Sequence, residues 1–408
     1  MRVKIIIAVV LLFTISFSWG CRSEKSFNDR LQLITEPYIF SILEWEWQMM
    51  VSSLDRIFQV HEHKIEDEII LVRDYFSIIN EIDDLNWKLF RLRDGSGQGD
   101  VNSTEAELLT LIEKRNALED SVEVIIERQI RDILISEGIF NPIDNYLPLK
   151  VSLPPINFEL EEPPKLLVVS PRDKIQSLRE ITLLQGISLG EIQKIEHDVG
   201  ELDVSSLVVE LGGLGATYPT FVTNDASLRF TINTAIEEWL HQYLAFKPLG
   251  FLYILDVLGI AKNYEVATIN ETFASMFSKE LGSIVCQRFY PLDGCIRQAP
   301  ADADSEFNRL MRQIRIHVDE LLLAGQVEQA ESYMEEQRQL LVSKGYYIRK
   351  LNQAYFAFHG TYADRPTSVS PIGAELGYLR EQSSTLRIFL NTAAMIRNRA
   401  DLINLVGR

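Results

Sequence analysis

Basic residues are scarce in this chain relative to acidic ones. Its 408 residues include 40 Lys and Arg against 58 Asp and Glu, so the formal net charge is −18 at pH 7. A surface that binds nucleic acid needs a basic stripe, and electrostatic adhesion to anionic lipid needs clustered cations. The charge balance argues against nucleic acid as a partner, and it makes the N-terminus the expected route of any membrane attachment.

Cysteine is also rare, with three residues in the whole chain. Cys21 stands alone near the N-terminus, whereas Cys286 and Cys295 flank a short segment that contains Pro291 and Gly294. Cysteines spread this widely do not form a zinc knuckle. In an oxidising compartment, Cys286 and Cys295 are placed to form a disulfide.

The chain begins with a short basic stretch, residues 1–4, and an apolar run over residues 5–17 that is too short to span a membrane comfortably. A Gly-Cys pair follows, and the arrangement resembles a bacterial lipoprotein signal. The resemblance implies that Cys21 is lipidated. An ordinary secretory signal and an uncleaved anchor are the alternatives, because Ser18 and Trp19 depart from the pattern. We expect an exported protein that is anchored to the membrane outside the cytoplasm.

Apolar residues recur at three- and four-residue steps through most of the next part of the chain. This pattern predicts helices over residues 27–60, 66–92 and 103–135, with a Gly-rich loop at 95–99. Proline pairs between residues 142 and 164 then break any helix. We therefore expect three parts: a signal or anchor (1–21), a helical bundle (22–140) and a second region (141–408).

The second region mixes strand and helix patterns. Short strands are predicted at 149–153, 158–160, 166–169 and within 207–222, and helices at 175–199, 302–324, 327–342, 345–358 and 372–397. The predicted fold class is α+β and mostly helical, with an N-terminal helical bundle followed by a region built from a small sheet and helices.

The residues that carry chemistry gather between positions 231 and 282. A helical segment there contains Glu237, Glu238 and His241, and Glu237 and His241 are four residues apart, so they project from one helix face. Asn270-Glu271 opens a second helical pattern and offers another carboxylate. A zinc hydrolase needs three protein ligands, an open position for water and a carboxylate base beside that water.

What the first segment lacks is a histidine at position 237, which the metallopeptidase motif H-E-x-x-H requires. With that one substitution, E-E-W-L-H followed by I-N-E resembles the gluzincin (thermolysin-like) clan of zinc peptidases. The resemblance implies that Glu237, His241 and Glu271 bind one divalent metal and that Glu238 activates water. It also implies that Asn270 orients His241. Zinc is the expected metal, and the harder set of two carboxylates and one imidazole leaves manganese and iron as alternatives.

A second departure from the clan lies at Ser275, where the clan has an aspartate that accepts a hydrogen bond from the first histidine ligand. A carboxylate at position 237 has no proton to donate, and a serine hydroxyl donates to it. Ser275 and Glu237 are thus chemically consistent, and we expect Ser275 to support Glu237. The Gly-rich piece within 207–222 matches the place of an edge strand that pairs with peptide substrate.

Downstream of these residues, a polar and aromatic loop contains His359, Tyr362 and Arg365. Zinc peptidases carry a Tyr or His that donates to the oxyanion of the tetrahedral intermediate. His359 and Tyr362 are the candidates for that role, and Arg365 is the candidate for binding a substrate carboxylate. An ordinary helix–helix connection is the alternative for this loop.

The sequence thus predicts an extracytoplasmic metal-dependent peptidase whose partners are a peptide or protein substrate and the membrane. One alternative is an inactive peptidase-like lipoprotein that acts as a binding or scaffolding protein. Another is a purely helical envelope protein, which would have no β-sheet between about residues 149 and 222.

Overall fold

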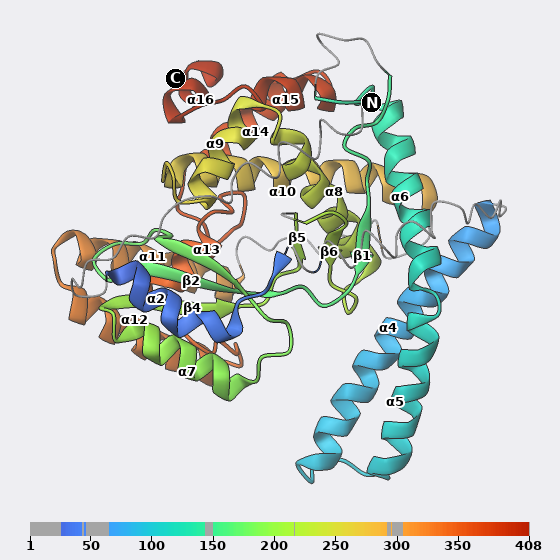
Figure 1. Cartoon of the computed structure of the whole chain (residues 1–408), viewed down its shortest axis with the longest axis horizontal. Coiled ribbons are helices and arrows are strands. Elements are labelled where there is room, and N and C mark those ends of the chain that lie inside the picture. The colour runs from blue at the N-terminus through green and yellow to red at the C-terminus, as the bar shows by residue number, and fades with distance from the viewer. Residues whose placement is uncertain are drawn as a thin grey trace.

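The computed structural model describes residues 26–42, 45, 65–142, 150–215, 217–291, 295 and 305–407. It is mostly helical and contains two three-stranded sheets in its described part (Figure 1). The predicted class, α+β and mostly helical, is confirmed. Both sheets lie between residues 158 and 222, which excludes the purely helical alternative.

Helices α4 (Ile65–Arg93) and α5 (Val101–Asn116) form a hairpin that projects from the body, and α6 (Glu119–Ser136) returns the chain to it (Figure 1). The helix predicted over 27–60 instead ends early. Helix α2 (Phe27–Thr35) gives way to a 3-10 turn, η2 (Glu36–Tyr38), because Pro37 lacks the N–H that a longer α-helix needs. Leu31 of α2 packs on the first sheet rather than on α4. Residues 46–64 lie outside the described part.

Three strands form the first sheet in the order β3-β2-β4, and both pairings are antiparallel. They are β2 (Lys165–Pro171), β3 (Arg179–Leu183) and β4 (Val204–Val209). Because side chains alternate along a strand, Leu167 and Val169 face α2 and α7 (Leu189–Gly200), whereas Val168 faces α13 (Gln353–His359). Both faces of the sheet are therefore covered by helices.

The prediction of a helix over 175–199 is wrong for the first half of that range, where Arg179–Leu183 form the strand β3. The helix begins only at Leu189, where Ser188 and Glu191 form a capping box. The strand over 166–169 is confirmed within β2. Residues 150–153, in contrast, are not a strand. Tertiary pairing with β2 thus overrode the helical period of the sequence before Leu189.

The second sheet has the order β1-β6-β5. Strand β1 (Phe158–Leu160) pairs in parallel with β6 (Thr220–Val222), which pairs antiparallel with the short β5 (Gly213–Leu214). These strands confirm the ones predicted at 158–160 and within 207–222. Strand β5 stands at the edge of this sheet and contacts the central helix α8.

Two long helices form the centre of the main core. Helix α8 (Leu228–Leu244) packs against α10 (Tyr264–Phe289), and α9 (Pro248–Val257) connects them. Gly282 allows the close approach, since a Cβ at this position would collide with Oδ1 of Asn233 on α8. Helices α4 and α6 contribute to the same core as α8 and α10.

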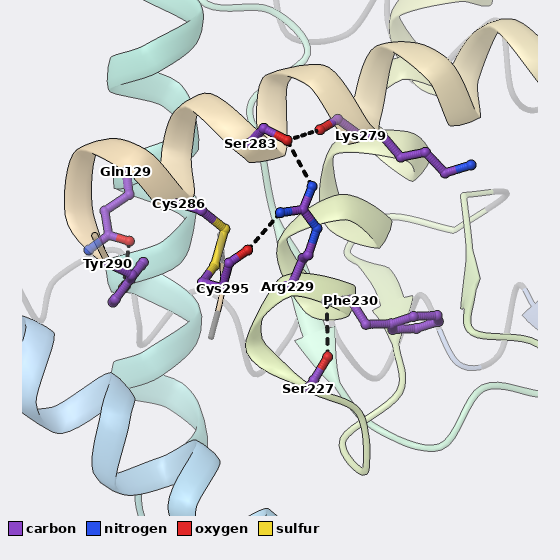
Figure 2. The surroundings of a disulfide bond; sticks show 9 residues. All are labelled: Gln129, Ser227, Arg229, Phe230, Lys279, Ser283, Cys286, Tyr290 and Cys295. Carbon is purple, nitrogen blue, oxygen red and sulfur yellow. Dashed lines mark hydrogen bonds between the residues drawn. A yellow bond between two sulfur atoms is a disulfide. The ribbon is translucent and has the colours of Figure 1, made fainter. Parts of the chain in front are cut away.

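Cys286 and Cys295 form a disulfide, which is the pairing that their positions in the sequence allow (Figure 2). The guanidinium of Arg229, in the first turn of α8, donates to the carbonyl of Cys295 at 2.6 Å and to Oγ of Ser283 at 2.7 Å. Arg229 and the disulfide therefore hold the beginning of α8, the end of α10 and the segment at Cys295 together.

The C-terminal helices follow the predicted ones with shifted bounds, and α16 lies beyond the last predicted helix. They are α11 (Glu306–Leu323), α12 (Val327–Ser343), α13, α14 (Ile372–Gln382), α15 (Leu386–Ala393) and α16 (Arg399–Val406). The helix predicted over 372–397 is two helices, because Thr385 caps a new start. The helix predicted over 345–358 begins only at Gln353, where Asn352 is the cap.

Candidate metal centre

Helix α8 presents three polar side chains from an otherwise apolar body. Its buried residues include Ile236, Trp239 and Leu240, which fix the orientation of the helix in the core. Glu237, Glu238 and His241 lie on the remaining face and are half-buried. The core thus holds the three polar groups in place.

Helix α10 presents the facing residues. It begins at Tyr264, with Asn263 as its N-cap, so Asn270 and Glu271 lie inside the helix and do not open it as predicted. Asn270 and Glu271 are buried. Both of their side chains are directed at α8, as the contacts with His241 show.

Glu237, His241 and Glu271 come together. Each offers one ligand atom, and these three atoms lie within 4.8 Å of one another. Nε2 of His241 is 3.8 Å from Oε2 of Glu271. Oxygen and nitrogen donors at this spacing are able to close on one divalent cation with small side-chain movements, since ligand distances are about 2 Å.

Asn270 orients the imidazole of His241. Its side-chain amide is 3.0 Å from Nδ1, while its own Oδ1 is buried without a hydrogen-bond partner. A 180° rotation of this amide places Oδ1 on an Nδ1–H group. That arrangement leaves the lone pair of Nε2 directed toward Glu271, which is the tautomer that a metal-ligating histidine requires.

Tyr253 is a site residue that the sequence did not reveal. Its hydroxyl donates to Oε1 of Glu271, and its ring stacks on His241 with centroids 5.6 Å apart. Tyr253 lies on α9, in an apolar stretch of sequence that by itself predicts only a buried helix. A polar hydroxyl within that apolar stretch was the one available signal.

Ser275 does not contact Glu237. Its hydroxyl donates to Oδ2 of Asp364 at 2.9 Å, and Lys279 pairs with the same oxygen at 2.5 Å. Ser278, one turn further along α10, donates to Oε2 of Glu237 at 3.3 Å. The expected serine donation to Glu237 therefore comes from a different serine, because Asp364 occupies the hydroxyl of Ser275.

Glu238 lies beneath the edge strand β5. A Cβ on Gly213 would be 2.8 Å from Oε1 of Glu238, and a Cβ on Gly215 would be 2.5 Å from Oε2. Both glycines are thus required for the strand to pass over this carboxylate. The backbone of Gly215 also donates a hydrogen bond to Glu238, so β5 and the candidate base are in direct contact.

The electrostatics of the cluster favour a cation. Burial, and then the negative charge of Glu271, raise the pKa of Glu237 to about 8. Burial, Glu237 and Glu271 raise the pKa of Glu238 well above its usual range. Within the described residues, no Lys or Arg forms an ion pair with any of these three glutamates. Lys279 and Arg365 lower the pKa of Glu237 again only in part. The cluster thus keeps an excess of negative charge that protons or a bound cation would offset.

The downstream loop is held against α10 on both sides of Tyr362: the hydroxyl of Thr272 donates to the carbonyl of Thr361 and accepts from the backbone N–H of Ala363. Burial, and then the charges of Glu271, Glu237 and Glu238, raise the pKa of Tyr362 well above its usual range.

His359, in contrast, responds to burial and to Arg365, which lower its pKa to about 4. Its ring packs on Tyr355, and Nη1 of Arg365 lies 3.3 Å from its Nδ1. The guanidinium of Arg365 lies over the ring of Tyr362, 4.4 Å from its centroid. Of the two oxyanion candidates, Tyr362 is the one whose environment includes the acidic cluster.

Comparison with known proteins adds no relative: no family model, no curated protein and no solved structure matches this chain. The geometry and chemistry of this cluster are therefore the guide to the function of the protein.

Proposed function

We propose that this protein is an extracytoplasmic metal-dependent peptidase of gluzincin-like design. The observation that carries the proposal is the convergence of Glu237, His241 and Glu271 from two packed helices, with Glu238 beside them. Two carboxylates and one imidazole suit zinc, and they also suit manganese or iron. The tautomer that Asn270 allows at His241 and the raised pKa of Glu237 fit such a group.

Each surrounding residue then has a role in peptide hydrolysis. A metal bound here would supply Lewis acidity toward water and the scissile carbonyl. Glu238 takes a proton from water and passes it to the leaving amine. Tyr362 donates to the oxyanion, with His359 as the alternative donor. Arg365 binds a carboxylate of the substrate.

Two residues position the ligands: Asn270 holds His241, and Tyr253 holds Glu271. The peptide itself would lie along the free edge of β5, which passes directly over Glu238.

The location of the protein is part of the proposal. Residues 1–21 act as a signal or anchor, and Cys21 carries the lipid. The Cys286–Cys295 disulfide suits a location outside the cytoplasm, because disulfides persist in oxidising compartments.

Metal content, measured by mass spectrometry on the full-length protein, tests the proposal. We expect about one metal per chain in the parent, as a single site of this kind implies, and loss of that metal in His241→Ala. The matched control is His197→Ala, which removes an exposed histidine on α7 and leaves the metal in place.

Two other outcomes contradict the proposal in different ways. An empty parent with a metal-loaded Glu237→His variant would mean that the site is switched off, which favours a binding or scaffolding protein. An empty site in all variants would remove metal chemistry altogether.

Activity follows as a separate assay on the metal-loaded protein. Glu238→Gln is expected to keep the metal and to lower cleavage of a peptide library by about 100-fold or more, since general-base catalysis contributes that much. Equal cleavage by parent and variant would exclude Glu238 as the base.

A further inference from the structure

Helices α4 and α5 project from the body as a hairpin, and one side of α4 faces solvent there (Figure 1). A shallow hollow of about 640 Å³ lies along this side. The residues of α4 that line it are Glu81, Asp84, Leu85, Trp87, Lys88 and Arg91. All of them except the half-buried Leu85 are exposed, and Trp87 is 66% exposed. The hollow is therefore a surface feature with a large aromatic side chain at its border.

The charged residues of this side form a self-complementary stripe. Positions 81, 84, 88 and 91 follow one another at steps of three, four and three, so they share one face of the helix. The acids lie toward the body and the bases toward the tip. If a second copy of the stripe runs antiparallel about a two-fold axis at the level of position 86, Glu81 lies opposite Arg91 of the other copy. Asp84 likewise lies opposite Lys88, and each pairing occurs twice.

Apolar residues flank the charged stripe on both sides. Leu85 and Trp87 are two positions apart on the helix, so they project to opposite sides of the stripe. In the antiparallel arrangement each lies beside the same residue of the other copy. Apolar surface thus meets apolar surface at both borders, and burial of the exposed Trp87 favours the contact.

The four charged groups form no ion pair within the described part of the chain. The ion pairs that α4 and α5 make there join Arg93 to Glu105, Arg115 to Glu119 and Glu68 to Arg128. Asp84 and Lys88 are one helical turn apart and still do not pair with each other, although this spacing permits it. Glu81 accepts a hydrogen bond from Ser77 at 3.4 Å. The charges of the stripe are therefore available to a second chain.

Two more acids lie near the basic half of the stripe. Glu107 of α5 lines the hollow. Asp94 follows at the tip, where it accepts from the backbone N–H and the hydroxyl of Ser96. This side of the hairpin is thus mixed in charge and offers neither a uniformly basic nor a uniformly acidic surface.

We propose that two copies of this chain associate through α4, antiparallel, about a two-fold axis at position 86. A partner of one charge sign would match only half of the stripe, and an uncharged partner would leave all four charges without counterparts. A parallel pair would place Arg91 beside Arg91 and Glu81 beside Glu81. The antiparallel copy matches every charge at once, so the pattern favours it over these occupants. No helix in the described part is long and apolar enough to span a membrane.

The same face of α4 stays open where the other copy would lie. Ser77 and Asp74, one and two turns nearer the body on the same stripe, are exposed. The last residue of α4, Arg93, lies about 10 Å past the axis at 1.5 Å per residue and would reach the level of Ile79 in the other copy. The contact from Glu81 to Arg91 is about 15 Å long, so the dimer should dissociate on dilution. It requires neither metal binding nor peptidase activity.

Sedimentation equilibrium of the full chain measures this association. Every protein carries Cys21→Ser, so that no disulfide between copies contributes. We expect a reversible dimer in the parent. Arg91→Glu and Glu81→Arg each place like charges opposite one another twice per dimer, and each should raise the dissociation constant about tenfold or more. The matched control is Lys114→Glu, which changes an exposed residue of α5 outside the hollow and should keep the parent value.

A mixture of the two variants tests the register of the contact. Copies with Glu81→Arg and copies with Arg91→Glu carry opposite charges at both positions, so together they should form a heterodimer with the parent affinity. A parent that stays monomeric at about 100 μM would overturn the proposal. A dimer that Arg91→Glu leaves unchanged would mean that another surface associates. A mixture no tighter than its components, with parent-like urea midpoints for both variants, would refute the antiparallel pairing.

Discussion

Replacing Glu237 by glutamine should stabilise the metal-free protein. Burial beside Glu271 raises the pKa of Glu237 from 4.5 to about 8. A raised carboxyl pKa means that its stabilising contribution is complete below pH 4.5 and is lost as the pH rises toward 8. At 1.36 kcal/mol per pKa unit, the loss at pH 7 is at most about 3 kcal/mol. Glutamine is neutral and nearly isosteric, so Glu237→Gln avoids this loss and still accepts from Ser278.

The assay is urea unfolding in chelator at pH 5 and pH 7. Glu237→Gln should unfold at a higher midpoint than the parent at pH 7, and the difference should shrink at pH 5. Glu107→Gln, on the exposed surface of α5, is the control and should leave the midpoint unchanged. With metal at about a thousandfold excess over Kd, the parent should gain about 4.1 kcal/mol and overtake the variant. An equal difference at both pH values in chelator would refute the electrostatic reasoning.

Three further substitutions probe the site and its support. Asn270→Ala should weaken metal affinity about 10–100-fold without unfolding the protein, since it removes the side chain that orients the ligand His241. Chelator competition measures this affinity, and an unchanged value would contradict the role of Asn270. Gly282→Ala should lower stability by about 1–3 kcal/mol, because its Cβ collides with Asn233 of α8; a parent-like urea midpoint would contradict the close packing. Cys286→Ser removes a disulfide whose cysteines are 9 residues apart in the sequence. It should lower the free energy of unfolding in urea without reductant by about 2–3 kcal/mol, and the parent protein in reductant should match the variant.

The candidate ligands could be predicted because their relationship is local. Glu237 and His241 are one helical turn apart, and Asn270-Glu271 lies in a strongly helical segment, so periodicity was enough to place each pair on a face. The convergence of the two helices is a feature of the tertiary structure, which periodicity alone does not predict. In the sequence it was visible only through the family resemblance, and in the structure it depends on the approach that Gly282 allows.

The parts that could not be predicted arrive from distant segments. Tyr253 reaches the site because α9 folds back between α8 and α10, and Asp364 reaches Ser275 from the loop after α13. Neither contact has a periodic signal. The strand β3 was missed for a related reason, since its partner β2 lies earlier in the chain and competes with local helix propensity.

Helix α10 has consequences for how this chain can change its length. It contacts α6, α8, α9, α14 and α15, and its residues serve the metal centre, the packing with α8 and the disulfide in succession. One residue inserted after Asn270 would rotate everything beyond it by about 100°. Ser278, Gly282 and Cys286 would then all leave their partners at once. The exposed turn between α4 and α5 has no such coupling, so insertions and deletions should accumulate there and be excluded from α10.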